Sequence, residues 1–275
     1  MNQKIHDFLF SPTNPRAVAW FRLVFGVMLP WFFWSRGLHH SYDDPGLVWL
    51  YDNVVLTQAY YLAFVVLSCL FALGYKPRVT GLILFVLLLP MASLSRGRQS
   101  RQVILLCLFA FSLLRSGAVR FPWQSSKAGP ELSAGPCWPV RVMQLQLTLL
   151  YLINALAKAT PGYLSGEGLA AIAASHDNFK VDLTAGSLVL GPLAIPNYLL
   201  AISSVLTELF LALGWWLTKH RWLVAGVGVA FHISLMFIFD IWMLHVASIF
   251  LYLAFLLPLI CRKRETSADP ENLTA

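Results

Sequence analysis

Long apolar runs dominate this chain, and they restrict its fold more than any other feature of the sequence. Each run needs about 20 residues to cross a bilayer as a helix. Charged residues and prolines delimit eight of them, at residues 16–36, 54–75, 79–95, 102–119, 139–158, 197–218, 222–239 and 241–260. Only 12% of the 275 residues are charged, against roughly 25% in a soluble domain. The sequence therefore predicts an all-α fold: a single-domain, polytopic membrane helical bundle of about eight transmembrane helices.

The distribution of Lys and Arg predicts the orientation, because loops rich in these residues stay on the cytoplasmic side. If both termini are inside, the inner side holds thirteen of the twenty Lys and Arg residues. The short tails, 1–15 and 261–275, are then cytoplasmic, and we expect a cell (inner) membrane of bacterial type. One loop departs from this rule, since it places Arg96, Arg98 and Arg101 outside. Either a helix is miscounted there, or these arginines hold an anion.

The remaining composition argues against several classes of function. The net charge is +7, but the basic residues lie between apolar runs, whereas a nucleic-acid binder has a basic stripe on water-soluble mass. The four cysteines are scattered without metal-ligand spacing. We therefore expect no nucleic-acid partner, no metal site and no disulfide framework. Membrane lipid and a small-molecule substrate are the expected partners.

The longest connection, 159–196, lies on the outer side in this topology. It combines Gly and Pro with small and apolar residues, which makes it too apolar for a disordered segment. Long connections inside compact folds are usually functional. We expect it to fold against the membrane face as an extracytoplasmic capping loop.

The fifth run is unusually polar for a membrane helix. Gln144, Thr148, Tyr151 and Lys158 are spaced so that they lie near one helical face, and Asn154 lies between them. Such a face lines a cavity, and a lysine buried there would have its charged form disfavoured, so that a neutral amine could act as a base. Alternatively, Lys158 ends the run near the outer boundary and extends to the headgroups.

Glu208, His232 and His245 are further ionisable residues within apolar runs, where charge is costly. Glu208 and His232 both lie near the expected midplane, on consecutive runs, so they are expected to satisfy each other or to form a proton path. His245 begins the last run, near the outer surface, as a core histidine or a site residue. Because the two histidines are expected at different depths, they make a poor axial pair, and no haem is expected.

The fifth run and the residues after it resemble a known family. The run from Gln144 to Lys158, followed by Tyr163 and Gly166-Glu-Gly168, looks like the HTTM (horizontally transferred transmembrane) domain. Glu208-Leu-Phe and Phe231-His232-Ile are a second match. The resemblance extends over about 16–260. This domain is shared with vitamin K-dependent gamma-carboxylase.

The resemblance implies a chemistry for one residue. In that family the matching lysine deprotonates reduced vitamin K, and the oxygenated product then abstracts a proton from glutamate before CO2 adds. Lys158 occupies the matching position, and a reduced, vitamin K-like quinone is the implied cofactor. The chain also departs from the pattern. The carboxylase has a large extracytoplasmic domain with no counterpart here, Arg-Gln-Ser-Arg-Gln replaces an Asn-His pair, and Tyr163 replaces a Trp.

Two functions follow as predictions. The first is a carboxylase-like or quinol-epoxidase-like membrane enzyme, a lyase or oxidoreductase, with Lys158 as base and His245 and His232 as catalytic partners. The second is a transporter or lipid-binding membrane protein with a proton-coupling Glu208–His232 pair. The expected substrate-binding residues are Arg96, Arg98, Arg101, Gln144, Tyr151, Asn154, Tyr163 and Glu208.

Overall fold

The computed structural model describes residues 3–37, 53–93, 99–114, 121, 123, 136–175, 179–190, 192–239 and 242–256. The chain divides into two compact units. Unit 1 comprises Met1–Met143 and Leu253–Ala275, and unit 2 comprises Gln144–Tyr252.

Each of the eight apolar runs contains a helix. These helices are α2 (Pro15–Gly37), α4 (Val54–Ala72), α5 (Pro77–Ser93), α6 (Gln99–Leu113), α7 (Trp138–Lys158), α10 (Asn197–Leu217), α11 (Arg221–Ile238) and α12 (Trp242–Leu251). Within the described residues, α4, α7, α10 and α11 are long and apolar enough to span a membrane. The chain is thus a helical membrane protein. A membrane crossing by α2, α5, α6 and α12 remains a prediction.

In unit 1, α4 packs against α2 and α5, and α5 packs against α6. A short helix, α1 (Gln3–Phe10), precedes them. The core of this unit contains Phe21, Phe25, Phe71 and Phe111, whose rings are in mutual contact. Arg22 of α2 is also fully buried, and its Nε lies 3.5 Å from the carbonyl oxygen of Ala72. A cation at this position complements the carboxyl end of α4.

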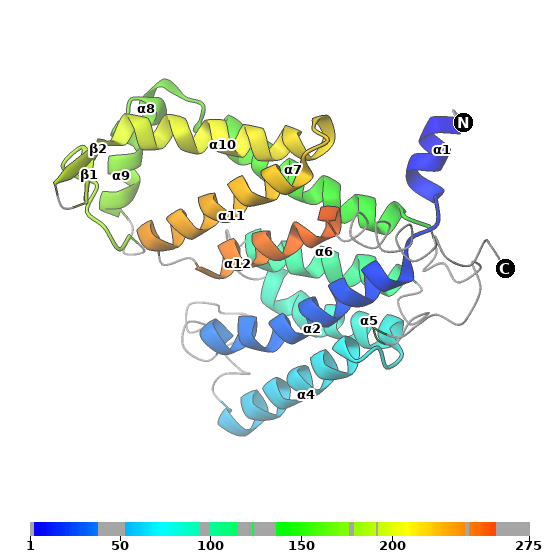
Figure 1. Ribbon diagram of the computed structural model, residues 1–275. Coiled ribbons are helices and arrows are strands. Elements are labelled where there is room, and N and C mark those ends of the chain that lie inside the picture. Colours follow the sequence, from blue (N-terminus) through cyan, green and yellow to red (C-terminus); the bar gives the residue numbers. More distant parts are fainter. Residues whose placement is uncertain are drawn as a thin grey trace. The chain divides into compact units, whose positions relative to one another are not determined.

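In unit 2, α10 and α11 pack together, and α11 packs against α12 (Figure 1). Gly214 of α10 faces Val224 of α11, where a Cβ would come within 3.1 Å of Cγ2. The indole Nε1 of Trp216 donates a hydrogen bond to Oγ1 of Thr148 at 2.7 Å and so links α10 to α7. These contacts bring the polar residues of four helices into one region.

The connection 159–196 is folded. It contains α8 (Pro161–Leu164), α9 (Glu167–Ser175) and an antiparallel hairpin of β1 (Ser187–Leu190) and β2 (Leu193–Pro196). Thr160 caps α8 directly before a proline at the first helical position, a pairing that favours a helix start. All of these elements lie at the end of unit 2 where α10 begins (Figure 1).

A small apolar core holds this connection together. Leu169, Leu183 and Leu188 are buried, and Tyr163, Phe179 and Ile238 are among the side chains packed on them. The Asn197 side chain donates a 2.7 Å hydrogen bond to the carbonyl oxygen of Leu183. In the loop before β1, the amide and hydroxyl of Thr184 donate to Asp182, which lowers the pKa of that exposed carboxyl. The expected folded segment is therefore present, and its position on the outer membrane face remains a prediction.

Candidate functional site

Lys158 and Glu208 form an ion pair inside unit 2. Nζ of Lys158 lies 2.8 Å from Oε1 of Glu208. The side chain of Glu208 is 5% exposed, whereas that of Lys158 is 32% exposed. The ring of Tyr163 lies near the same amine, with its centroid 6.0 Å from Nζ. The pair joins the last residue of α7 to the middle of α10.

This pairing corrects the prediction that Glu208 and His232 satisfy each other. The prediction placed residues by the depth of their backbone along each run, which put Lys158 at the outer boundary. Helical side chains, however, point back toward the amino end of their helix. The long side chain of Lys158 can therefore extend back along α7 to Glu208.

His232 belongs to a second set of contacts. Its Nε2 lies 2.6 Å from the hydroxyl of Tyr151, and its Nδ1 lies 3.1 Å from Nδ1 of His245. The Tyr151 hydroxyl in turn lies 2.5 Å from that of Tyr252. We call Tyr252, Tyr151, His232 and His245 the aromatic chain; each is at least nine-tenths buried.

The expectation that the two histidines lie at different depths is wrong. His232 lies six residues before the end of α11, and His245 lies three residues after the start of α12. At about 1.5 Å per residue, both are within roughly 10 Å of the same helix–helix junction. Their rings meet because the chain reverses direction between them.

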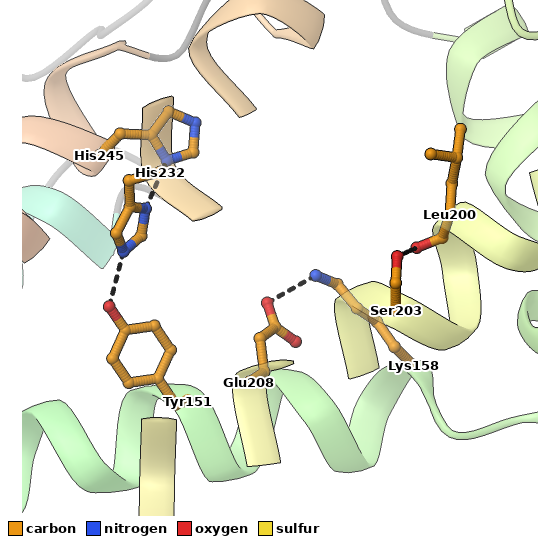
Figure 2. Close-up of polar contacts among 7 residues, drawn as sticks. All are labelled: Tyr151, Lys158, Leu200, Ser203, Glu208, His232 and His245. Carbon is orange, nitrogen blue, oxygen red and sulfur yellow. Dashed lines mark hydrogen bonds and ion pairs between the residues drawn. The ribbon is translucent and has the colours of Figure 1, made fainter. Parts of the chain in front are cut away.

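The ion pair and part of the aromatic chain line a single cavity of about 850 Å³. Figure 2 shows the Lys158–Glu208 pair and the Tyr151–His232–His245 contacts, whose residues all line this cavity. The polar residues lining the cavity are Tyr151, Asn154, Lys158, Tyr163, Ser203, Ser204, Thr207, Glu208, His232, Ser234, His245 and Ser248. Leu150, Leu169, Ile172, Phe179, Leu183, Leu200 and Phe231 are among its apolar residues. Both α9 and the loop before β1 contribute to this wall.

Two buried polar atoms beside the cavity lack a partner among the described residues. They are Oε2 of Glu208 and Nε2 of His245. Buried polar atoms are almost always hydrogen-bonded in folded proteins, to protein or to another molecule. These atoms therefore mark where a bound molecule could supply the missing hydrogen bonds.

The predicted site residues fall into three groups. Tyr151, Asn154, Lys158, Tyr163, Glu208, His232 and His245 line the cavity. Gln144 is buried but is not among the residues lining it, although it was expected on the same helical face. Arg96 and Arg98 lie outside the described residues. Arg101 lies in α6, and its side chain is not described.

The sequence prediction missed several residues of the site. They are Ser203, Ser204, Thr207, Ser234 and Ser248 of the cavity wall, and Tyr252 of the aromatic chain. His245, Ser248 and Tyr252 are spaced by three and four residues, which places them on one face of a helix. Ser204 lies four residues before Glu208, and Ser203 lies four before Thr207. These polar i, i+4 spacings in apolar helices were the available signal. Among the described residues, no group of three or more His, Cys, Asp or Glu is placed to hold a metal ion.

Comparison with known proteins identifies a family. A protein-family model described as the HTTM domain matches residues 10–259. No curated protein and no solved structure matches the chain. The matched region includes every described residue of the cavity.

Proposed function

This chain belongs to the HTTM domain family, and on that premise we propose that it is a membrane enzyme resembling vitamin K-dependent gamma-carboxylase. Its substrate is a lipid-soluble quinol or a related small molecule. The Lys158–Glu208 pair acts as the base that removes a proton from a ring hydroxyl of this substrate. The membrane is a cell (inner) membrane with both termini cytoplasmic, as the Lys and Arg distribution favours.

The observation that carries the proposal is the composition of the cavity wall. A partly buried ion pair, with one unpartnered carboxylate oxygen, lines a cavity whose other walls are largely apolar. A cavity of about 850 Å³ is within the usual range for small-molecule sites. A quinol has matching parts, because its ring and tail are apolar and its hydroxyls can bond to the pair.

The ion pair also balances charge during proton removal. Lys158 and Glu208 share one ionisable proton in the resting pair, either as ammonium and carboxylate or as amine and carboxylic acid. When the pair accepts a second proton from the hydroxyl, it becomes ammonium and carboxylic acid, with a net charge of +1. This charge neutralises the quinolate that remains. Opposite charges interact strongly in such a low-dielectric site.

The test compares the purified full chain with variants in mild detergent. Co-extracted lipids are identified by mass spectrometry, and consumption of an added reduced naphthoquinone with a short prenyl tail is measured. Lys158→Ala and Lys158→Arg are expected to lower turnover at least about 100-fold, the scale of general-base catalysis. Lys219→Ala, at an exposed lysine outside the cavity, serves as the matched control.

The possible outcomes distinguish an enzyme from a transporter or lipid-binding protein. Quinone bound to the wild type, with turnover lost only in the Lys158 variants, supports the enzyme. Turnover by Lys158→Ala at the wild-type rate contradicts the proposed base. Bound phospholipid in place of quinone, with no turnover, would instead favour a transport or lipid-binding role. Size-exclusion chromatography confirms that each variant remains folded and monodisperse.

A further inference from the structure

The aromatic chain is a series of hydrogen bonds whose direction can be worked out from its ends. Tyr252 stands at one end, and its hydroxyl bonds only to Tyr151 among the described residues. His245 stands at the other end, with its Nε2 unpartnered among the described residues. Each member between the ends must accept from one neighbour and donate to the next.

Both imidazoles are neutral, because a charged ring buried here would have no carboxylate in hydrogen-bonding contact among the described residues. His232 bonds to Tyr151 and His245, and Oε1 of Glu208 is bonded to Lys158. A neutral imidazole carries one N–H and one bare nitrogen. Of the two facing Nδ1 atoms, on His232 and His245, one therefore carries a hydrogen and donates it, and the other accepts it.

The Tyr252 hydroxyl determines which of the two Nδ1 atoms is the donor. Its hydrogen has one acceptor among the described residues, the oxygen of Tyr151. Tyr151 then donates to Nε2 of His232, so His232 carries its hydrogen on Nδ1 and donates to Nδ1 of His245. His245 is left with its hydrogen on Nε2. The Ser248 hydroxyl also bonds to that of Tyr151, and this bond is compatible with the same order because Tyr151 can accept twice.

The reverse direction is less favourable. It would leave the buried Tyr252 hydrogen without an acceptor, and it would also leave Nε2 of His245 as an unsatisfied acceptor. A buried donor without a partner loses its hydration without compensation. The order that starts at Tyr252 leaves one unsatisfied group among the described members of the aromatic chain, the N–H of His245.

We infer that His245 is a hydrogen-bond donor on the cavity wall, binding an acceptor oxygen of the ligand, and that Tyr252, Tyr151 and His232 are positioning residues that set its tautomer. The class of ligand oxygen, a quinone carbonyl or a quinolate, rests on the proposed function. The tautomer assigned to His245 does not depend on the proposed function. His245 thus stabilises negative charge on the ligand, while the Lys158–Glu208 pair takes the proton.

The first test measures the tautomers directly. The full chain is labelled with ¹⁵N-histidine in detergent, and its ring signals are assigned with His232→Gln and His245→Gln. We expect His245 to be protonated at Nε2 and bare at Nδ1, and His232 to be protonated at Nδ1 and bare at Nε2. The opposite assignment, with Nε2 of His245 bare, would overturn the inference whether or not a quinone binds.

Two tyrosine variants test whether the aromatic chain sets the tautomers of the two histidines. Tyr151→Phe removes the donor to His232, so both histidines are expected to show a mixture of tautomers. Tyr252→Phe removes the terminal donor that fixes the direction of the aromatic chain, so the wild-type tautomers are expected to be mixed there too, though less completely because the Tyr151 hydroxyl remains. Unmixed wild-type tautomers in Tyr151→Phe would show that the aromatic chain does not set the tautomer of His245.

The second test uses an oxidised naphthoquinone with a short prenyl tail, which has acceptor oxygens and undergoes no turnover. His245→Leu is expected to weaken its binding roughly tenfold, the scale of one lost hydrogen bond. His245→Gln should keep most of the affinity, since its amide can donate from a similar position. Equal binding by the wild type and His245→Leu would contradict the donor role. If the wild type binds no quinone but shows the expected tautomers, the proposed function fails and the donor assignment stands.

Discussion

Nζ of Lys158 lies 2.8 Å from Oε1 of Glu208, and the two residues are separated by 50 positions in the chain. The carboxylate is almost completely buried, while about a third of the lysine side chain is exposed. The partners therefore differ in how much each depends on the other. Lys158 can be hydrated in part without Glu208, but Glu208 has no comparable access to water.

This asymmetry predicts unequal costs for the two single substitutions. Lys158→Met should lower the free energy of unfolding by about 3 kcal/mol, since it leaves a buried charge without its partner. Glu208→Gln should cost only about 1 kcal/mol, because the remaining ammonium is partly solvated. The double variant Lys158→Met/Glu208→Gln should cost less than the two single substitutions together, because it leaves no charge without its partner. Unfolding in mixed detergent measures all three, and additive costs in the double variant would contradict the pairing.

Two glycines of α11 provide a matched test of the contact between α11 and Tyr252. A Cβ on Gly228 would lie 2.4 Å from the Tyr252 hydroxyl oxygen, whereas a Cβ on Gly226 would meet nothing within 4 Å. Gly228→Ala should therefore destabilise the protein by about 1 to 3 kcal/mol, as overpacking does. Gly226→Ala should be neutral, or stabilising by up to about 1 kcal/mol. Thermal unfolding in detergent distinguishes them, and equal effects would contradict the close approach of Tyr252.

A second glycine pair tests how the connection 159–196 is attached to α10. Gly166 has φ +88°, and a Cβ there would lie 2.6 Å from the amide nitrogen of Tyr198. Gly162 has open space at the same position. Gly166→Ala should cost about 2 kcal/mol, because both the left-handed backbone and the contact disfavour a side chain. Hydrogen exchange should then increase in 159–196, while Gly162→Ala should leave it unchanged.

Filling the cavity should abolish ligand binding without altering its ionisable groups. Ala230 lines the cavity, and Ile233 lies on the same helix but is exposed elsewhere. Ala230→Phe should weaken binding of the short-tailed naphthoquinone by at least about tenfold, since the ring occupies volume that the ligand needs. Ile233→Phe is the control and should bind as the wild type does. Unchanged binding by Ala230→Phe would place the ligand outside this cavity.

Three of the helices could be predicted from the sequence almost to the residue. The apolar runs 139–158, 197–218 and 222–239 correspond to α7, α10 and α11 within one residue at each end. The family was also identifiable from Lys158, Glu208 and His232 in their local sequence. These properties are encoded locally, since a membrane helix depends on the length and polarity of one continuous run.

The partners of the buried polar residues were decided by the tertiary structure. The sequence identified Lys158, Glu208, His232 and His245 as unusual, yet the predicted Glu208–His232 pair is replaced by Lys158–Glu208 and His232–His245. Tyr252 was not predicted at all. Depth along a helix locates a Cα atom, but a hydrogen bond depends on side-chain direction and on the rotation of each helix about its axis. Both are settled only when helices pack, because packing determines which faces meet.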